Sequence, residues 1–229
     1  MDFSCKGALA GYRSLLRTKP EWFRNNPRGG ITILTSDEEM EQACREAESF
    51  RMARGLSVTD LRVGLLARDP YMTIVRDAVR FPDGSMGLYN RVIETSPVAV
   101  LPLLAGRPVL VKIFRHGLRE WSWEFPRGAC DEGESAEAGA RRELEEEIGG
   151  KTLEMISLGE FTPGGSSLSI RARLFAATID RIGRRDVREG IEDVRAVDVA
   201  TVEYKILSGE IIDGFSIALF TRARLAKLL

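Results

Sequence analysis

The chain has 229 residues, of which 44% are hydrophobic and 29% are charged, and its formal net charge is −1. Such a chain is ordinary globular material that can form one large domain or a domain with an appendage. The near-neutral charge gives no electrostatic reason to expect nucleic acid or an anionic membrane as the main partner. The chain has no apolar run long enough for a membrane span, and its N-terminus lacks the apolar core of a signal peptide, so we expect a cytoplasmic protein.

Cysteine and histidine are too few and too scattered for the sites that they usually build. The three cysteines, Cys5, Cys44 and Cys130, form no CxxC pair and no cluster with histidine. We therefore expect neither a disulfide framework nor a zinc site. The single histidine, His116, argues against a Ser-His-Asp triad. Carboxylates and a metal ion are the expected source of chemistry.

The N-terminal part of the chain predicts one helix after an irregular segment. Residues 1–35 are expected to be irregular, because prolines and a glycine pair interrupt any long element. A helix is expected over residues 36–55. Ser36 and Glu39 match a capping box at its start, and Gly55 ends it.

From residue 61 onward the hydrophobic pattern changes to that of β-strands. The expected strands are residues 71–81, 87–93, 97–104, 109–114, 120–125, 153–161, 170–179 and 194–199. A charged loop over residues 180–193 precedes the last of them. A final helix, with a possible break at Ser208-Gly209, runs to Leu229. This mixture of strands and helices predicts an α/β fold.

The stretch from Gly128 to Gly150 predicts a glycine-led loop followed by a helix, if Ser135 is the N-cap and Gly149-Gly150 ends the helix. Ala140, Leu144 and Ile148 recur every fourth residue and form an apolar stripe that would pack on a core.

Three carboxylates share one face of this helix. Glu143, Glu146 and Glu147 stand at positions i, i+3 and i+4, where each adjacent like-charged pair costs about 0.2–0.5 kcal/mol in water. A hard divalent cation with oxygen ligands offsets that repulsion, and Mg²⁺ fits best because it bridges a few carboxylates to substrate phosphates. On the helix alone, an acidic face that only contacts solvent is an equal alternative.

The spacing of the whole stretch resembles the Nudix box, the signature of enzymes that hydrolyse a nucleoside diphosphate linked to another moiety. The matching residues are Gly128, then after five residues Glu134, after seven more Arg142-Glu143-Leu144, after one more Glu146-Glu147, and after one more Gly149. The departure is Gly150, where the family usually has an aliphatic residue. The resemblance implies a Nudix-type α/β/α sandwich with a mixed sheet, plus the N-terminal helix and antiparallel strands.

The segments around the box resemble the ADP-ribose pyrophosphatase branch of that family. The matching features are Arg115-His116, the run Trp121-Ser-Trp-Glu124-Phe-Pro126 that leads to Gly128, and the loop Pro163-Gly-Gly165. Two features depart from the branch. Ser166-Ser-Leu-Ser169 follows that loop where an acidic residue is common, and Arg127 replaces a small residue. ADP-ribose is the favoured substrate, and a UDP- or GDP-sugar stays open.

The same resemblance implies a division of the chain and a partner. Residues 1–55 would form an N-terminal arm and amphipathic helix, residues 56–94 antiparallel strands for dimerisation, and residues 95–229 the Nudix hydrolase domain. We therefore expect a homodimer that acts on a small nucleotide sugar, with no nucleic-acid partner.

By carry-over from the box, Glu143, Glu146 and Glu147 would coordinate Mg²⁺, with Mn²⁺ as an alternative. The metal would bridge the diphosphate and acidify an attacking water. Arg142 would orient these carboxylates, together with Glu134.

The general base is expected from the charged loop, where the candidates are Glu189, Glu192 and Asp193, with Glu192 favoured and also expected near the metal. The remaining candidates are residues expected to contact substrate: Arg115, Glu124, Gly128 and Trp121, the last by stacking on a base. The implied reaction cleaves ADP-ribose to AMP and ribose 5-phosphate. A different class of function stays open, namely a sensor that binds ADP-ribose through a Nudix-like domain without cutting it.

Overall fold

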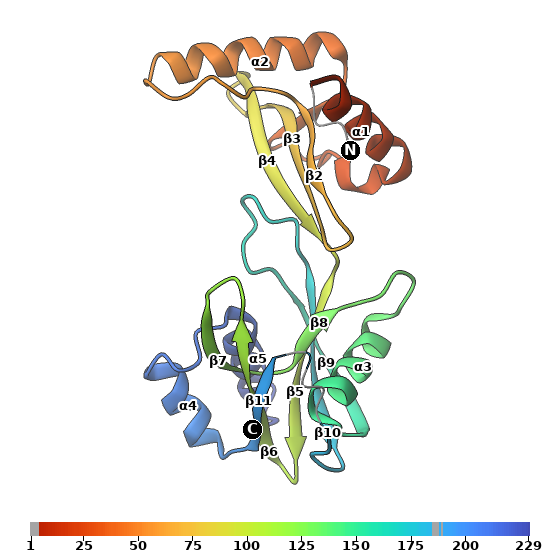
Figure 1. Cartoon of the computed structure of the whole chain (residues 1–229), viewed down its shortest axis with the longest axis vertical. Coiled ribbons are helices and arrows are strands. Elements are labelled where there is room, and N and C mark those ends of the chain that lie inside the picture. Colours follow the sequence, from red (N-terminus) through yellow and green to blue (C-terminus); the bar gives the residue numbers. More distant parts are fainter. Residues whose placement is uncertain (1–4, 185–187, 189) are drawn as a thin grey trace. The chain divides into compact units, whose positions relative to one another are not determined.

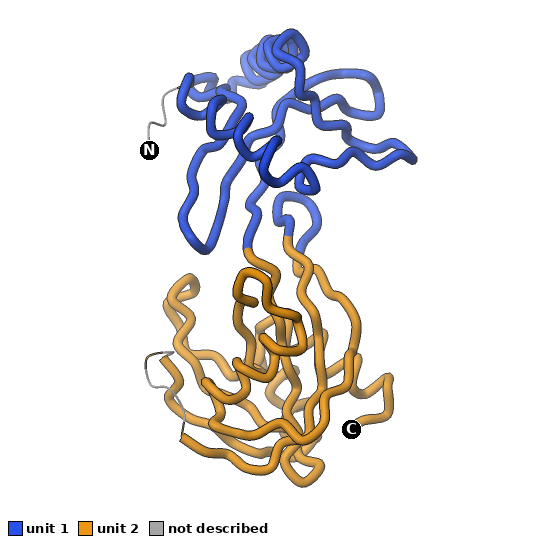
Figure 2. Tube along the Cα trace, turned by 90° about the vertical axis from the view of Figure 1, so that its right-hand side faces the viewer, with its two compact units in different colours: residues 1–94, 164–169 blue, residues 95–163, 170–229 orange. Residues whose placement is uncertain are grey.

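The computed structural model describes residues 5–184, 188 and 190–229 (Figure 1). Its chain forms two compact units (Figure 2). The first consists of the described residues up to Glu94 together with Gly164–Ser169, and the second of Thr95–Pro163 with the described residues from Ile170 to Leu229. Among the described residues, no helix combines the length and the apolar character that crossing a bilayer requires.

The first unit is a four-stranded antiparallel sheet in which β3 is central. Its strands are β1 (Thr32–Leu34), β2 (Gly64–Arg68), β3 (Met72–Arg80) and β4 (Met86–Glu94). Its helices are α1 (Cys5–Thr18), the 3-10 turn η1 (Pro20–Phe23) and α2 (Asp37–Met52). The strands expected at residues 71–81 and 87–93 are confirmed as the antiparallel pair β3 and β4. The start of α2 is also confirmed, where the Ser36 side chain accepts a hydrogen bond from the Glu39 N–H.

The expectation that residues 1–35 are irregular is wrong, because α1 occupies Cys5–Thr18. Ala8, Tyr12 and Leu15 recur at i, i+4 and i+7 and are buried, so one face of α1 joins the core of this unit. The prolines that argued against a helix lie beyond Thr18, where they do not interrupt it.

A buried polar group fixes α1 on the sheet, and its removal should destabilise the protein. Tyr12 donates its hydroxyl to Asp77, which also accepts hydrogen bonds from Arg91. Burial, followed by the charge of Asp77, raises the pKa of Tyr12, so the hydroxyl stays protonated. Tyr12→Phe leaves the buried Asp77 carboxylate without one donor, and we expect unfolding in urea to show a loss of about 1–3 kcal/mol.

Tyr71→Phe is the matched control, because Tyr71 is 76% exposed. It should stay within about 0.5 kcal/mol of the parent. Equal stabilities of the two variants would show that the Tyr12 hydroxyl does not anchor α1.

The second unit is a sandwich of helices on both faces of a seven-stranded mixed sheet. The strand order is β11-β6-β5-β10-β9, with β7 paired to β6 and β8 to β5. Strands β5 and β10 run parallel to each other, and the other pairs that the described residues form in this sheet are antiparallel. The strands are β5 (Pro97–Leu104), β6 (Arg107–Arg115), β7 (Glu120–Glu124), β8 (Arg127–Ala129), β9 (Thr152–Phe161), β10 (Ala172–Ile179) and β11 (Ile191–Ala196). The helices are α3 (Ala136–Ile148), α4 (Val199–Leu207) and α5 (Gly214–Leu225).

Alternate residues along β5 point to opposite faces of the sheet and show which helices cover each face. Val98 and Val100 of β5 pack in the core under α3, whereas Ala99 and Leu101 pack in the core with α4 and α5. The predicted α/β/α sandwich with a mixed sheet is therefore confirmed.

Of two element boundaries expected near the C-terminus, the structure confirms one and shifts the other. The break at Ser208-Gly209 is confirmed, because α4 ends at Leu207 and α5 begins at Gly214. The strand expected at residues 194–199 is shifted: β11 begins at Ile191, whose buried side chain joins the core under α3. Val199 already belongs to α4, which Asp198 caps.

Candidate active site

Local sequence positions α3 as expected. The Ser135 side chain accepts a hydrogen bond from the Ala138 N–H, and Gly149 ends the helix in the left-handed conformation at φ 69°. Ala140, Leu144 and Ile148 are fully buried against the sheet. This packing fixes the rotation of the helix, and with it the direction of its acidic face.

The three carboxylates of that face lie at the boundary between core and solvent. Glu143 and Glu147 are 8% and 2% exposed, and Oε2 of Glu147 is buried. The side chain of Glu146 is 46% exposed. A face that only contacts solvent would not bury two of its three acids, so the structure argues against that alternative.

Gly128 of β8 forms a close cradle for one of these acids. A Cβ atom on Gly128 would lie 2.1 Å from both Cδ and Oε1 of Glu143 and 2.2 Å from Oε2. The Glu143 carboxylate therefore rests directly against the backbone of β8, in space that only glycine leaves open.

Arg142 connects the carboxylates to the loop before the helix. It donates to Glu143 Oε1 at 2.8 Å and to Glu146 Oε2 at 3.0 Å. It also donates to Glu134 Oε2 at 3.1 Å and to the Ala129 carbonyl at 2.7 Å. The hydrogen bond from Arg142, followed by one from the Asp131 N–H, lowers the pKa of Glu134, which therefore stays ionised. The structure thus brings together Arg142 and Glu134, as the resemblance to the Nudix box implied.

A second charged cluster lies on the β6–β7 hairpin. Arg115 Nε donates to Glu124 Oε2 at 2.8 Å, and the Glu124 side chain is 1% exposed. Arg127 lies 3.3 Å from the same oxygen and 3.5 Å from Asp213 Oδ1. Burial disfavours the charge on Arg115, but the hydrogen bond and charge of Glu124, followed by the charge of Glu147, outweigh it and raise the pKa of Arg115.

The electrostatic effect of Glu147 on Arg115 couples this second cluster to the acidic face of α3. The link between Arg127 and Asp213 was missed at the sequence level. Its only signals were the arginine where the family has a small residue and an aspartate in position to cap α5.

The candidates for the general base have separate positions. Glu192 lies in β11, not in a loop, and pairs with Lys112 Nζ of β6 at 2.7 Å. Asp193 pairs with Arg195 Nε at 2.5 Å. Glu189 lies outside the described residues. The catalytic role of each stays a prediction.

Trp121, expected to contact substrate, is 49% exposed on β7. Its ring packs edge-on against Phe114 with 5.5 Å between centroids. The exposed part of the indole is available to a ligand.

The donor set suits a hard cation that is completed by substrate. The described residues contain no group of three or more His, Cys, Asp and Glu side chains arranged to hold a metal by themselves. Mg²⁺ does not need such a cage, since it is usually bound by one or two carboxylates, waters and substrate phosphates. Glu143 and Glu147, with Glu146 at the rim and the backbone of Gly128 behind Glu143, provide oxygen ligands of that kind.

Comparison with known proteins identifies the family to which this fold and its acidic helix belong. The family model described as NUDIX domain matches residues 95–213, which is more than half of the chain. The protein therefore belongs to the Nudix family.

The individual proteins that resemble this chain share limited sequence with it. The ADP compounds hydrolase NudE of Escherichia coli (strain K12) is 27% identical over 121 residues, which are 52% of this chain and 65% of that protein. An RNA pyrophosphohydrolase of Caulobacter vibrioides (strain NA1000 / CB15N) is 48% identical over 40 residues, 18% of this chain and 23% of the relative. The chain thus matches less than two thirds of the length of these relatives.

A solved structure, the crystal structure of an ADP compounds hydrolase, superposes with a TM-score of 0.62. The match covers 72% of this chain and 90% of that one at 20% sequence identity. At that identity the likeness supports the fold alone.

Proposed function

We propose that the protein is a divalent-metal-dependent pyrophosphohydrolase that cleaves the diphosphate of a nucleoside diphosphate sugar, with ADP-ribose split to AMP and ribose 5-phosphate. The observation that carries the proposal is the acidic face of α3, where Arg142 donates to Glu143 and Glu146, Glu143 lies against Gly128, and Glu147 is buried. Membership of the Nudix family supports the same chemistry.

Each residue has a defined task in this proposal. Glu143, Glu146 and Glu147 would hold Mg²⁺, which when bound neutralises charge on the diphosphate and lowers the pKa of a water. Arg142 keeps Glu143 and Glu146 in one orientation through its hydrogen bonds. Arg115, held by Glu124, offers a positive charge to the diphosphate.

For the base we favour Glu192, with Glu189 and Asp193 as the other candidates. To accept a proton, Glu192 must exchange its ion pair with Lys112 for a contact with water. The Glu192→Gln variant therefore tests its role directly. A fall in kcat supports Glu192, and an unchanged kcat would leave Glu189 and Asp193 as the candidates.

The identity of the substrate's nucleobase has weaker support than the type of reaction. The printed name of the E. coli relative refers to ADP compounds, and at 27% identity it favours an adenine nucleotide here. A UDP- or GDP-sugar would use the same carboxylates. A sensor that does not cut its ligand has no need of these acids, and this chain retains all three.

A substrate panel tests the proposal. Purified protein with Mg²⁺, and separately with Mn²⁺, is incubated with ADP-ribose, ADP-glucose, UDP-glucose, GDP-mannose and NADH, and products are identified by mass spectrometry. We expect AMP and ribose 5-phosphate from ADP-ribose at the highest rate. Faster cleavage of a UDP- or GDP-sugar would correct the substrate, and binding without cleavage of any compound would favour a sensor.

We also propose that the protein is a homodimer that pairs through the strands of residues 56–94. Exposed Tyr71 and Met72 at the start of β3 support an apolar contact there. Light scattering at working concentration tests this, and a monomer mass would overturn it.

A further inference from the structure

Arg127 is a charged residue of this site that the resemblance does not explain, since the branch has a small residue at its position. Its Nε lies 3.3 Å from Glu124 Oε2 and 3.5 Å from Asp213 Oδ1. Its guanidinium also lies over the Phe215 ring, 4.9 Å from the ring centroid. Arg127 therefore connects β8 with the start of α5 and places one positive charge between two carboxylates.

Other contacts hold both of these carboxylates in place. The Glu124 side chain is 1% exposed and accepts a hydrogen bond from Arg115 Nε at 2.8 Å. Asp213 caps α5, because its side chain accepts hydrogen bonds of 2.8 Å from the N–H and the hydroxyl of Ser216. The Ser216 hydroxyl in turn accepts a hydrogen bond from the Phe125 N–H at 2.9 Å. Neither carboxylate is free to turn toward water, so each negative charge has to be balanced where it lies.

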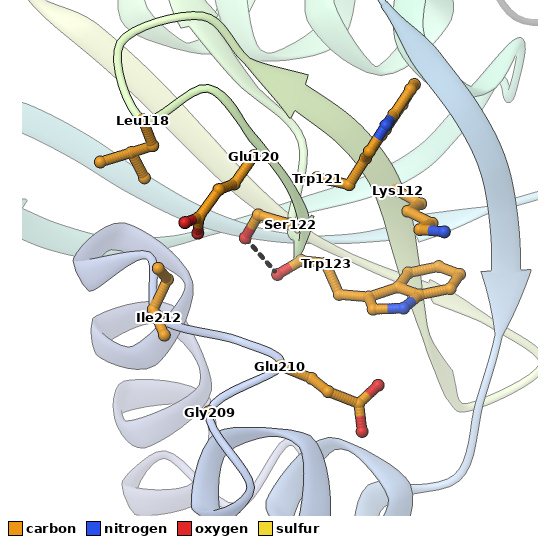
Figure 3. A pocket seen from close by; sticks show the side chains of 9 residues that line it. All are labelled: Lys112, Leu118, Glu120, Trp121, Ser122, Trp123, Gly209, Glu210 and Ile212. Atoms are coloured by element: carbon orange, nitrogen blue, oxygen red, sulfur yellow. Dashed lines mark hydrogen bonds between the residues drawn. The ribbon is translucent and has the colours of Figure 1, made fainter.

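The residue before Asp213 offers a way to disturb this region without changing its charge. Ile212 lines a cavity of about 270 Å³ between β7 and the turn that joins α4 to α5 (Figure 3). Figure 3 shows the Ile212 side chain across the cavity from Trp121 and Lys112. Because Ile212 is 52% exposed, its truncation removes little packing and no charge.

Three carboxylates act on Arg115, the residue expected to contact the diphosphate. The charges of Glu124, Glu147 and Asp213 each stabilise its positive form. Arg127 offsets two of them through its contacts with Glu124 and Asp213. Together the two arginines balance these two carboxylates. Without Arg127, one net negative charge would remain beside Glu147, and it would oppose the binding of a diphosphate.

We propose that Arg127 is a positioning residue for substrate binding: it neutralises Glu124 and Asp213, and thereby leaves the charge of Arg115 available to the diphosphate. The inference rests on the proposed function, which places a diphosphate at this face of α3. Arg127 acts through its neighbours and does not itself contact the reacting atoms.

The test measures binding of methylene diphosphonate, a diphosphate analogue whose bridge cannot be hydrolysed, by calorimetry in the presence of Mg²⁺. Arg127→Met removes the charge and keeps an unbranched side chain, whereas Arg127→Lys keeps the charge. Asp213→Asn removes one negative charge, and its amide oxygen can still cap α5. The double variant Arg127→Met/Asp213→Asn restores the charge balance. Ile212→Ala is the matched control.

We expect Arg127→Met to weaken binding of the analogue about tenfold or more. Its KM for ADP-ribose should rise by a similar factor while kcat stays within about threefold, the pattern of a lost binding interaction. Arg127→Lys should bind the analogue within about threefold of the parent, and the double variant should recover most of the affinity. Ile212→Ala should bind as the parent does.

The double variant separates charge from packing, because it lacks the Arg127 side chain in either case. The inference is overturned if the parent does not bind the analogue, if Arg127→Met binds it with parental affinity, or if the double variant binds as weakly as Arg127→Met. Asp213→Asn alone, which keeps Arg127, should bind at least as tightly as the parent. Weaker binding by Asp213→Asn would also overturn the inference, and this variant decides the question even if Arg127→Met does not fold.

The two proposals fail separately. The analogue is bound without being cleaved, so binding that depends on Arg127 can be present in a protein that hydrolyses no nucleotide sugar, which would overturn the hydrolase alone. Cleavage of ADP-ribose with a KM that Arg127→Met leaves unchanged would overturn the role of Arg127 alone.

Discussion

Glu147→Gln should lower kcat for ADP-ribose by at least about 100-fold. The Glu147 side chain is buried beside Glu143, and the amide keeps its shape but removes the negative charge that would hold the metal. Glu146→Gln should have a similar effect, because Glu146 shares Arg142 with Glu143. Steady-state kinetics at saturating Mg²⁺ measures both.

Glu145→Gln is the matched control, because Glu145 lies on the same helix with its side chain exposed. It should keep kcat within about twofold, as expected of a surface substitution away from the site. Near-normal turnover of Glu147→Gln would remove Glu147 from the mechanism.

Gly128→Ala is the second change with a large expected effect. The new Cβ would meet the Glu143 carboxylate at 2.1 Å, and the carboxylate is the end of a flexible side chain. We therefore expect the carboxylate to move while the fold survives. A displacement of this size should lower kcat by roughly 10- to 100-fold, because small misplacements of catalytic groups are costly.

Gly117→Ala controls for the loss of a glycine in the same unit, since its Cβ would meet nothing within 4 Å. Thermal unfolding of Gly128→Ala should stay close to that of the parent. A variant with full activity would show that Glu143 does not need its position against β8, and a variant that unfolds would show that the contact supports the fold.

The parts of the site that depend on neighbouring residues were predictable from sequence. Ser135 and Gly149 delimit α3 because capping is a local interaction, and the spacing of Glu143, Glu146 and Glu147 fixes their common face. Their burial was not predictable, because it depends on how β8 and the sheet pack against the helix.

The parts that depend on residues distant in sequence were missed. Helix α1 was missed because Pro20 and Gly29-Gly30 were given more weight than the spacing of its buried residues. The ion pair between Lys112 and Glu192 joins residues of β6 and β11, and only strand pairing brings them together. The contact of Arg127 with Asp213 likewise requires the tertiary fold.

Metal-dependent release of AMP from ADP-ribose tests the central claim most directly. Protein stripped with EDTA is titrated with Mg²⁺, and AMP and ribose 5-phosphate are quantified by mass spectrometry, with Glu147→Gln in parallel. We predict no cleavage without metal, saturable cleavage as Mg²⁺ is added, and little product from the variant at any Mg²⁺ concentration. Cleavage that persists in EDTA, or a variant that matches the parent, would contradict a catalytic role for the acidic face of α3.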